Sequence, residues 1–297
     1  MIYLKSFKLP TRSEEDEFIL SYPPELEMQC YDNNNAYPFK LFPHKGFDSI
    51  SFAPVTIFYG GNGSGKSTLL NIIAEKLEIS RSAPFNRAPC FSKFLELCRC
   101  SFAPKIGAAI ANGRIITSDD VFDFLLDRRA MNEGISERRE SLFSEYIGLK
   151  NEFYSEKPFA SIEDYESLKQ RNEAKRKSMS AYTAKRLPRE IPAKSNGESA
   201  YHYFTDKIGE NALYLLDEPE NSLSASLQTE LLGFLEDSAR FYNCQFIIST
   251  HSPFLLSLKD ALVYDLDSVP VRTKNWTELE NVRIYYDFFR KHEHEFR

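Results

Sequence analysis

A glycine-rich segment at residues 60–67, GGNGSGKS, carries the residue types best suited to chemistry. It fits the pattern G-x-x-x-x-G-K-[ST] of a phosphate-binding loop, or P-loop. Glycines let backbone N–H groups turn toward phosphate oxygens, and a following helix adds its positive dipole end. Lys66 is predicted to reach the β- and γ-phosphates, and Ser67 to ligate Mg²⁺. The candidate nucleotide-binding residues are Gly60, Gly61, Asn62, Gly63, Ser64, Gly65, Lys66, Ser67 and Thr68.

Two further polar segments follow apolar runs. Asp217 and Glu218 end the run ALYLL, and His251 comes shortly after QFIIS. Such runs are typical of buried parallel strands, whose carboxyl ends bind ligands. Asp217 is predicted to hold Mg²⁺, Glu218 to act as the general base on the attacking water, and His251 to contact the γ-phosphate. Lys66, Glu218 and His251 are the predicted catalytic residues.

The elements that must position these residues are a strand at 55–59, a helix at 66–77, and strands at 212–217 and 245–249. Residues 1–54 alternate apolar and polar positions, which predicts strands of an antiparallel sheet beside the core. The predicted fold class is α/β: a mainly parallel P-loop sheet, an antiparallel N-terminal sheet and an inserted helical subdomain.

The order of the motifs resembles the ABC-type ATPase superfamily, which includes transporter motors and the SMC and RecF-like chromosome proteins. KSNGES, residues 194–199, then corresponds to the signature motif, approximately L-S-G-G-[QE]. The resemblance implies that Ser195, Gly197 and Glu198 form this motif. It further implies that the serine and glycine amides of one subunit close over the γ-phosphate held by the other. The cofactors implied are ATP and Mg²⁺.

Further segments resemble a family of small soluble bacterial predicted ATPases. They read LYLLDEPENSLS, QFIISTHSPFLLSLKDALVYDLD and WTELENVRIYYDFF. Three positions depart from the superfamily. Ser224 stands where transporter motors have aspartate, Lys194 replaces the signature leucine, and residues 113–125 contain no glutamine for the glutamine loop.

We predict one ABC-type ATPase domain with four segments: N-terminal strands at 1–54, the P-loop half at 55–131, a helical hairpin at 132–192, and the remaining motifs at 193–297. The first hairpin helix has Ile135, Leu142, Tyr146, Leu149 and Phe153 on its seam. Ser161 caps a second helix, on which Ile162, Tyr165, Leu168, Met179 and Tyr182 recur.

The second predicted helix is rich in cations over residues 169–189. These are Lys169, Arg171, Lys175, Arg176, Lys177, Lys185, Arg186 and Arg189, with the single acid Glu173. The strip suits phosphates of DNA or RNA, but it also suits a solvated face or an acidic partner surface.

Aromatic residues raise two more predictions. Tyr37, Phe39 and Phe42 suit either packing, which is favoured, or stacking on adenine. Residues 275–297 predict an amphipathic helix that packs on the core with Trp276, Leu279, Val282, Tyr286 and Phe289 inward.

The net charge of −6 argues against a wholesale nucleic-acid coat. No run approaches the roughly 18 apolar residues of a membrane span, and the odd count of five cysteines suggests free thiols. We therefore expect a cytoplasmic protein without a membrane partner.

The sequence predicts Mg²⁺-dependent ATP hydrolysis in a head-to-tail homodimer, in a DNA-related or defence process, with an unidentified effector protein as a further partner. A transporter motor, a non-hydrolysing ATP-gated switch and a P-loop kinase stay open as alternatives.

Overall fold

The structure is a computed structural model. It describes residues 1–21, 37–85, 87–88, 90–104, 106–151, 169, 172–174, 176–188 and 195–296. The chain divides into two compact units, residues 1–122 with 195–297, and residues 123–194.

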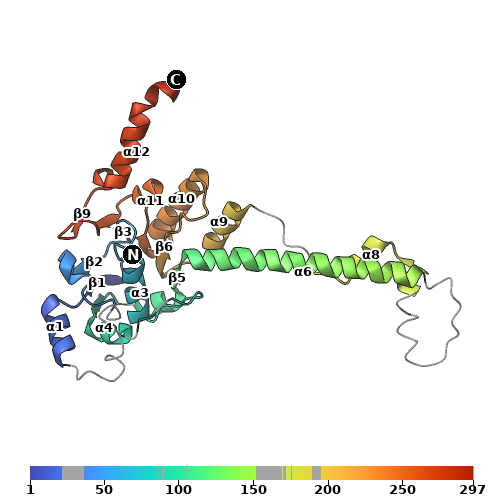
Figure 1. Cartoon of the computed structure of the whole chain (residues 1–297), viewed down its shortest axis with the longest axis horizontal. Coiled ribbons are helices and arrows are strands. Elements are labelled where there is room, and N and C mark those ends of the chain that lie inside the picture. The colour runs from blue at the N-terminus through green and yellow to red at the C-terminus, as the bar shows by residue number, and fades with distance from the viewer. Residues whose placement is uncertain are drawn as a thin grey trace. The chain divides into compact units, whose positions relative to one another are not determined.

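The core of the first unit is a six-stranded sheet (Figure 1). Its order is β5-β6-β7-β3-β8-β9, and every neighbouring pair is parallel except β8 and β9. The strands are β3 (Val55–Tyr59), β5 (Arg114–Ile116), β6 (Leu213–Asp217), β7 (Gln245–Ser249), β8 (Leu262–Asp265) and β9 (Arg272–Thr273). All residues of β3 and β7 are buried, as expected for central strands of a parallel sheet covered on both faces.

The strand order decides which loops meet. The P-loop follows β3, the acidic pair ends β6, and β7 lies between these two strands. The loop after β7 contains His251, so the three predicted motifs share one edge of the sheet. The α/β P-loop fold with a mainly parallel core sheet is therefore confirmed.

Two helices, α3 (Lys66–Lys76) and α10 (Ala225–Phe241), follow the P-loop and the acidic pair in the chain. Helix α3 begins directly at the P-loop and buries Leu69, Leu70 and Ile73, the helical spacing read from the sequence. Helix α10 connects β6 to β7, as parallel neighbouring strands require.

The N-terminal antiparallel sheet is present, with two corrections. It contains β1 (Leu4–Lys8), β2 (Ser49–Ser51) and β4 (Arg99–Phe102) in the order β2-β1-β4. Its third strand therefore comes from beyond residue 54. Residues 12–21 form helix α1 (Arg12–Ser21) rather than a strand. The amides of Tyr3 and Leu4 donate to Gln245 Oε1 at 2.8 and 2.9 Å, which ties this sheet to β7.

The remaining elements of the first unit are short or peripheral. They are η2 (Pro43–Lys45), α4 (Phe91–Leu97), α5 (Ile106–Asn112), α9 (Asn196–Lys207), α11 (Pro253–Leu256), η4 (Trp276–Glu278), α12 (Glu280–Lys291) and η5 (Glu293–Phe296).

The inward packing predicted for residues 275–297 is wrong at three positions. Leu279 and Val282 are buried, but Trp276, Tyr286 and Phe289 are 37%, 52% and 52% exposed. The helix period correctly grouped these residues on one face, but most of that face is not covered by described parts of the chain.

The second unit is built on the long helix α6 (Ser118–Asn151), whose first residues belong to the first unit. The helix runs without a break across the boundary predicted at residue 132. Leu142 and Tyr146 of the predicted seam pack with Ala174 and Tyr182.

The continuous second helix predicted for this unit is wrong in its described part. The chain leaves the helix at residues 177–178, and Ser178 caps the separate helix α8 (Met179–Ala184) through the amide of Ala181. The predicted cap at Ser161 and the proline turn before it lie outside the described residues, as do Ile162, Tyr165 and Leu168.

Candidate nucleotide-binding site

The backbone of the P-loop requires glycine at defined points. Gly63 and Gly65 have φ of +79° and +101°, values that L-residues rarely adopt. A Cβ at Gly60 would lie 2.7 Å from Ser64 Oγ. The loop is therefore tightly packed, and its buried Ser64 hydroxyl lacks a hydrogen-bond partner among the described residues. Both features fit a loop that surrounds an anionic ligand.

Two side chains that the sequence reasoning missed fasten this loop. Lys45 Nζ donates to Ser64 O at 2.7 Å, and Gly61 N donates to Asp267 Oδ2 at 2.6 Å. Lys45 and Asp267 lie outside the P-loop motif and far from it along the chain, so no sequence pattern predicts these two contacts.

The ammonium of Lys66 is buried beneath the loop and meets His251. It donates to Gly60 O at 2.9 Å and lies 2.7 Å from His251 Nε2. Because an ammonium has no acceptor, Nε2 is the acceptor in this contact. Burial and the neighbouring Lys66 both lower the pKa of His251, so its ring is neutral at pH 7. The structure thus brings together two residues that are 185 positions apart.

The predicted metal ligands also meet. Ser67 Oγ donates to Asp217 Oδ1 at 3.0 Å, and Ser249 Oγ donates to the same oxygen. Burial raises the pKa of Asp217, and the two hydroxyls oppose that effect. The buried Asp217 carboxylate and the Ser67 hydroxyl therefore place two hard oxygen ligands next to each other, and a cation between them would offset the buried negative charge. These residues fit Mg²⁺, which typically takes one or two carboxylates and substrate phosphates.

Glu218 reaches the same point through an unusual backbone conformation. Its φ is +47°, and its N–H donates to Ser249 O at 2.9 Å. A left-handed conformation at a non-glycine residue costs roughly 1–2 kcal/mol. Glu218 Oε1 lies 3.8 Å from Lys66 Nζ and 3.6 Å from His251 Nε2. The strained turn at Glu218 therefore places its carboxylate near Lys66 and His251, the other two predicted catalytic residues.

Glu220 is a further residue of the site that sequence reasoning missed. Its Oε1 accepts hydrogen bonds from the amides of His251 at 2.7 Å and Ser252 at 3.2 Å. Burial raises the pKa of Glu220, and the bond from His251 N opposes this. The carboxylate therefore holds the histidine loop against the acidic loop. In the sequence, the only indication of this role is that Glu220 ends the acidic segment DEPE, residues 217–220.

The cavity beside the P-loop has a volume of about 320 Å³. Its lining is Tyr37, Leu41, Asn62, Gly63, Gly65, Lys66, Ser67, Thr68 and Glu218. The hydroxyls of Tyr37 and Thr68 are in contact. Tyr37 is 43% exposed, whereas Phe39 and Phe42 are buried in the core. Packing is thus the role of the two phenylalanines, while Tyr37 borders the cavity.

The signature residues form the start of α9. Ser195 caps the helix, exchanging hydrogen bonds with Glu198 in a capping box. A Cβ at Gly197 would lie 3.2 Å from Ser222 O, so this turn packs on the loop after the acidic pair. Among the described residues, the lining of the P-loop cavity includes none of Ser195, Gly197 and Glu198.

Comparison with known proteins supports this description. Residues 192–257, which hold the signature, the acidic pair and His251, match the family model described as "AAA domain, putative AbiEii toxin, Type IV TA system". Over this segment the chain is thus similar to a family of AAA domains, which agrees with the P-loop ATPase resemblance expected from the motifs. No curated protein matches the chain.

Solved structures of similar proteins include SMC heads and a transporter cassette. The SMC head domain of Pyrococcus furiosus is 13% identical, with 97% of this chain and 100% of that chain covered and a TM-score of 0.42. An ATP-binding cassette of an ABC transporter in its ADP conformation is 15% identical, with 96% and 99% covered and a TM-score of 0.43. The SMC head domain from Thermotoga maritima is 14% identical, with 89% and 94% covered and a TM-score of 0.35. At these low scores, the strand order and the P-loop position remain the basis for the fold.

Proposed function

We propose that this chain binds and hydrolyses Mg·ATP at a site completed by a second subunit. The observation that carries the proposal is the convergence of Lys66, Glu218 and His251 at the mouth of the P-loop, with Ser67 and Asp217 beside them. The match of residues 192–257 to an AAA family model supports an ATPase.

Each side chain has a defined task in this proposal. Lys66 and the loop amides bind the phosphates, and Ser67 and Asp217 hold Mg²⁺. When bound, Mg²⁺ neutralises charge on the phosphate oxygens. Glu218 accepts a proton from the attacking water, because its carboxylate lies at the site and is held by Asn221 Nδ2 at 3.2 Å. The neutral His251 ring contacts the γ-phosphate.

The adenine end of the nucleotide is assigned to Tyr37. Its exposed ring borders the cavity next to Thr68, so it is available to stack on a base. This assignment chooses stacking for Tyr37 alone among the three aromatics considered from the sequence.

The second subunit supplies the signature turn. Ser195 and Glu198 are exposed, and they lie outside the cavity lining of their own chain. The N-terminus of α9 offers amides and a positive dipole end suited to a phosphate. We assign the amides of Ser195 and Gly197 to the γ-phosphate of the partner; the Ser195 N–H donates to Glu198 Oε2 at 2.9 Å in this structure and exchanges that acceptor for the phosphate on closure.

Subunit mixing tests hydrolysis and dimer completion together. Lys66→Ala and Ser195→Arg should each abolish phosphate release from Mg·ATP. Mixed dimers contain one intact composite site, so an equal mixture should recover about a quarter of wild-type activity. Half of the dimers are mixed, and each has one of two sites. Mixing Lys66→Ala with Glu218→Gln is the control, because both lesions lie on the P-loop side.

Each outcome of the mixing test has a distinct meaning. Recovery that is equal in both mixtures would contradict completion in trans. If Ser195→Arg retains full activity, Ser195 acts only as the N-cap of α9 and not in the composite site. Phosphate release that Lys66→Ala leaves unchanged would refute the ATPase itself.

One further prediction concerns nucleic acid. Nucleic-acid binding by residues 169–189 is a prediction, although Glu173 pairs with Lys177, Lys185 and Arg186 and so neutralises part of the strip. Salt-dependent binding of DNA or RNA would test it. Within the described residues, no helix is long and apolar enough to cross a membrane.

A further inference from the structure

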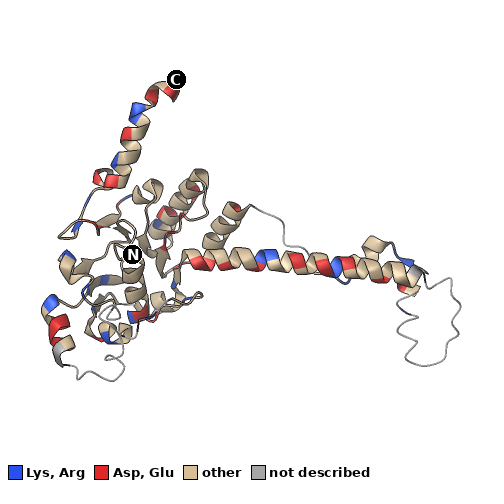
Figure 2. Ribbon diagram, in the orientation of Figure 1, with Lys and Arg blue, Asp and Glu red and all other residues tan. Residues whose placement is uncertain are grey.

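Helix α12 carries an apolar face that the described parts of the chain cover only in part. Ile284, Tyr285, Tyr286, Phe288 and Phe289 are between 45% and 60% exposed. At about 100° per residue, Tyr285, Tyr286 and Phe289 lie on the side of the buried Val282, and Phe288 and Ile284 extend the apolar arc to about 200° around the helix. By the same period, the opposite face carries the charges, Glu280, Arg283, Asp287, Arg290 and Lys291. Figure 2 shows acidic and basic positions distributed along α12. Exposed aromatic surface of this extent marks an interaction site.

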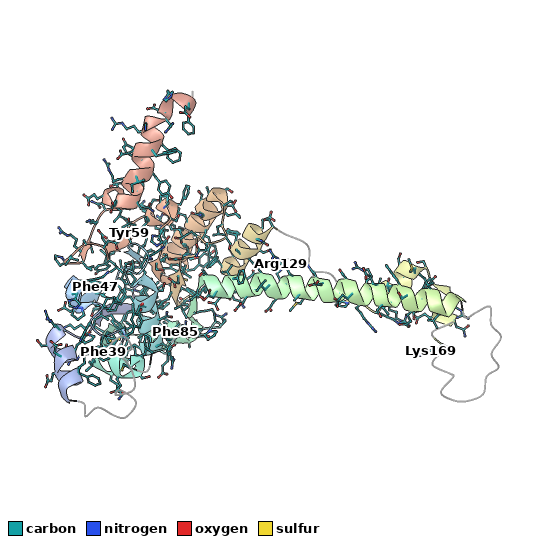
Figure 3. All side chains as sticks on the ribbon, in the orientation of Figure 1. Phe39, Phe47, Tyr59, Phe85, Arg129 and Lys169 are labelled. Atoms are coloured by element: carbon teal, nitrogen blue, oxygen red, sulfur yellow. The ribbon has the colours of Figure 1, made fainter. Side chains whose placement is uncertain are left out.

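The base of this helix is fastened to the candidate active site. Asn281 N donates to the hydroxyl of Tyr59 at 3.1 Å, and Asn281 Nδ2 donates to His251 O at 3.1 Å. Leu279 is fully buried just before the helix. Tyr59 is labelled at this point in Figure 3, which also shows the side chains along α12. The position of α12 is therefore coupled to the histidine loop.

A groove of about 970 Å³ continues from the active site onto the apolar face. Its lining includes Glu218, Asn221 and His251 of the candidate site together with Tyr285, Tyr286 and Phe289 of α12. The side chains of the proposed composite site and the aromatic face thus belong to one continuous surface.

We propose that the apolar face of α12 binds the same face of a second copy of this chain, without nucleotide. The pairing is separate from the nucleotide-dependent closure proposed above, and it keeps two half-sites together between ATP cycles. It rests on the proposed function for that benefit and for part of the argument that a second copy is the occupant, although the contact itself needs neither ATP nor the catalytic residues.

The area of the face favours a second copy as its occupant. A buried aromatic side chain covers about 150–250 Å². At about half exposure, the five residues of α12 and the 73% exposed Phe296 present roughly 100 Å² each, or roughly 600 Å² per copy. Two equal faces together expose roughly 1,200 Å², so burial of the whole apolar arc would reach the lower end of the range for stable interfaces.

Continuity with the active-site surface gives the second reason. The proposed dimer already brings a second copy to the loops around Glu218 and His251, and the groove joins those loops to α12. A partner of another kind on α12 would compete with that copy for the same surface.

The test is the molar mass of the full chain in nucleotide-free buffer with a chelator, measured by light scattering over a concentration series. Wild type should approach twice the chain mass of 34.3 kDa. The double variant Ile284→Glu, Phe288→Glu should weaken the dimer at least tenfold, because it buries two charges in the apolar contact. Neither residue lines the groove beside Glu218.

Phe241→Glu is the matched control, since Phe241 is 63% exposed at the end of α10. It should leave the dimer unchanged. The thermal midpoints of the double variant and the control should agree within a few degrees, which excludes misfolding as the cause of dissociation.

Three results would overturn the pairing: a monomeric wild type without nucleotide, a dimer that survives the double variant, or a dimer equally weakened by Phe241→Glu. A monomer that dimerises on Mg·ATP would leave the proposed function standing alone. An α12-dependent dimer that releases no phosphate would leave the pairing standing and refute the function.

Discussion

Replacing Glu220 with alanine is expected to slow ATP hydrolysis far more than it weakens nucleotide binding. Glu220 does not line the P-loop cavity, but its carboxylate accepts hydrogen bonds from His251 N and Ser252 N. Truncation removes both bonds. Ser252 N keeps a second partner, Thr250 Oγ1 at 3.0 Å, so the loss falls mainly on His251 N.

The size of the effect follows from that lost bond. A hydrogen bond to a charged group contributes about 1.5–3 kcal/mol. If about 2–3 kcal/mol is lost from holding His251 in place, kcat falls by roughly 30- to 160-fold. This is an upper range, because the adjoining groove admits water to the freed amide.

The assay is steady-state phosphate release together with nucleotide affinity. Glu220→Gln is the matched control, since it retains an acceptor oxygen and loses only the charge. Its loss in kcat should stay below about tenfold, or about 1.4 kcal/mol. The dissociation constant for nucleotide should change less than kcat in both variants.

Two outcomes would refute this reasoning. If alanine and glutamine at position 220 reduce kcat equally, the backbone hydrogen bonds are not the cause. If the thermal midpoint falls while kcat is unchanged, Glu220 stabilises the fold without positioning His251.

Three further predictions concern the site and its support. Glu218→Gln should lower phosphate release at least a hundredfold. In the Ile284→Glu, Phe288→Glu background it should also form a dimer with Mg·ATP that Ser195→Arg abolishes; persistent monomer with ATP bound would contradict this. Tyr37→Ala should weaken ATP binding by about 1–2 kcal/mol, or roughly 5- to 30-fold. Tyr37→Phe should bind normally, and equal losses in both would point to the hydroxyl contact with Thr68. Burial raises the pKa of Glu15 to about 7, so the folded state holds this proton more tightly than the unfolded chain. Its stabilising contribution is present below about pH 4.5 and is lost as pH rises through about 7. Relative to Glu15→Gln, wild type should therefore lose on the order of 2–3 kcal/mol of unfolding free energy between these limits, measured by denaturant titration; a constant difference would exclude Glu15 as the cause.

The nucleotide loop and its flanking elements were predictable because their causes are local. Positive φ at Gly63 and Gly65 demands glycine, and uninterrupted apolar runs demand burial on both faces of a sheet. The helix after Lys66 and the cap at Ser195 likewise depend on residues within a few positions of one another.

Errors arose where the local pattern permits two outcomes. Alternation in residues 1–54 suggested strands throughout, yet residues 12–21 are helical, and β1 found its second partner at residues 99–102. The heptad-like spacing predicted one helix through Met179 and Tyr182, but Ser178 interrupts it and caps the separate helix α8. Such choices depend on what packs against a segment, which its own sequence does not contain.

By itself, the sequence determined which residues can cradle phosphate, bind a hard cation and accept a proton, because these abilities belong to side-chain types and short-range backbone geometry. Tertiary structure alone decided that they meet. Placing β7 between β3 and β6 brings Ser67 to Asp217 across 150 positions and gives His251 its contact with Lys66. It also decided the left-handed turn at Glu218, the link through Glu220 and the exposure of α12. A helical period shows which residues share a face, but only the packed chain shows whether anything covers it.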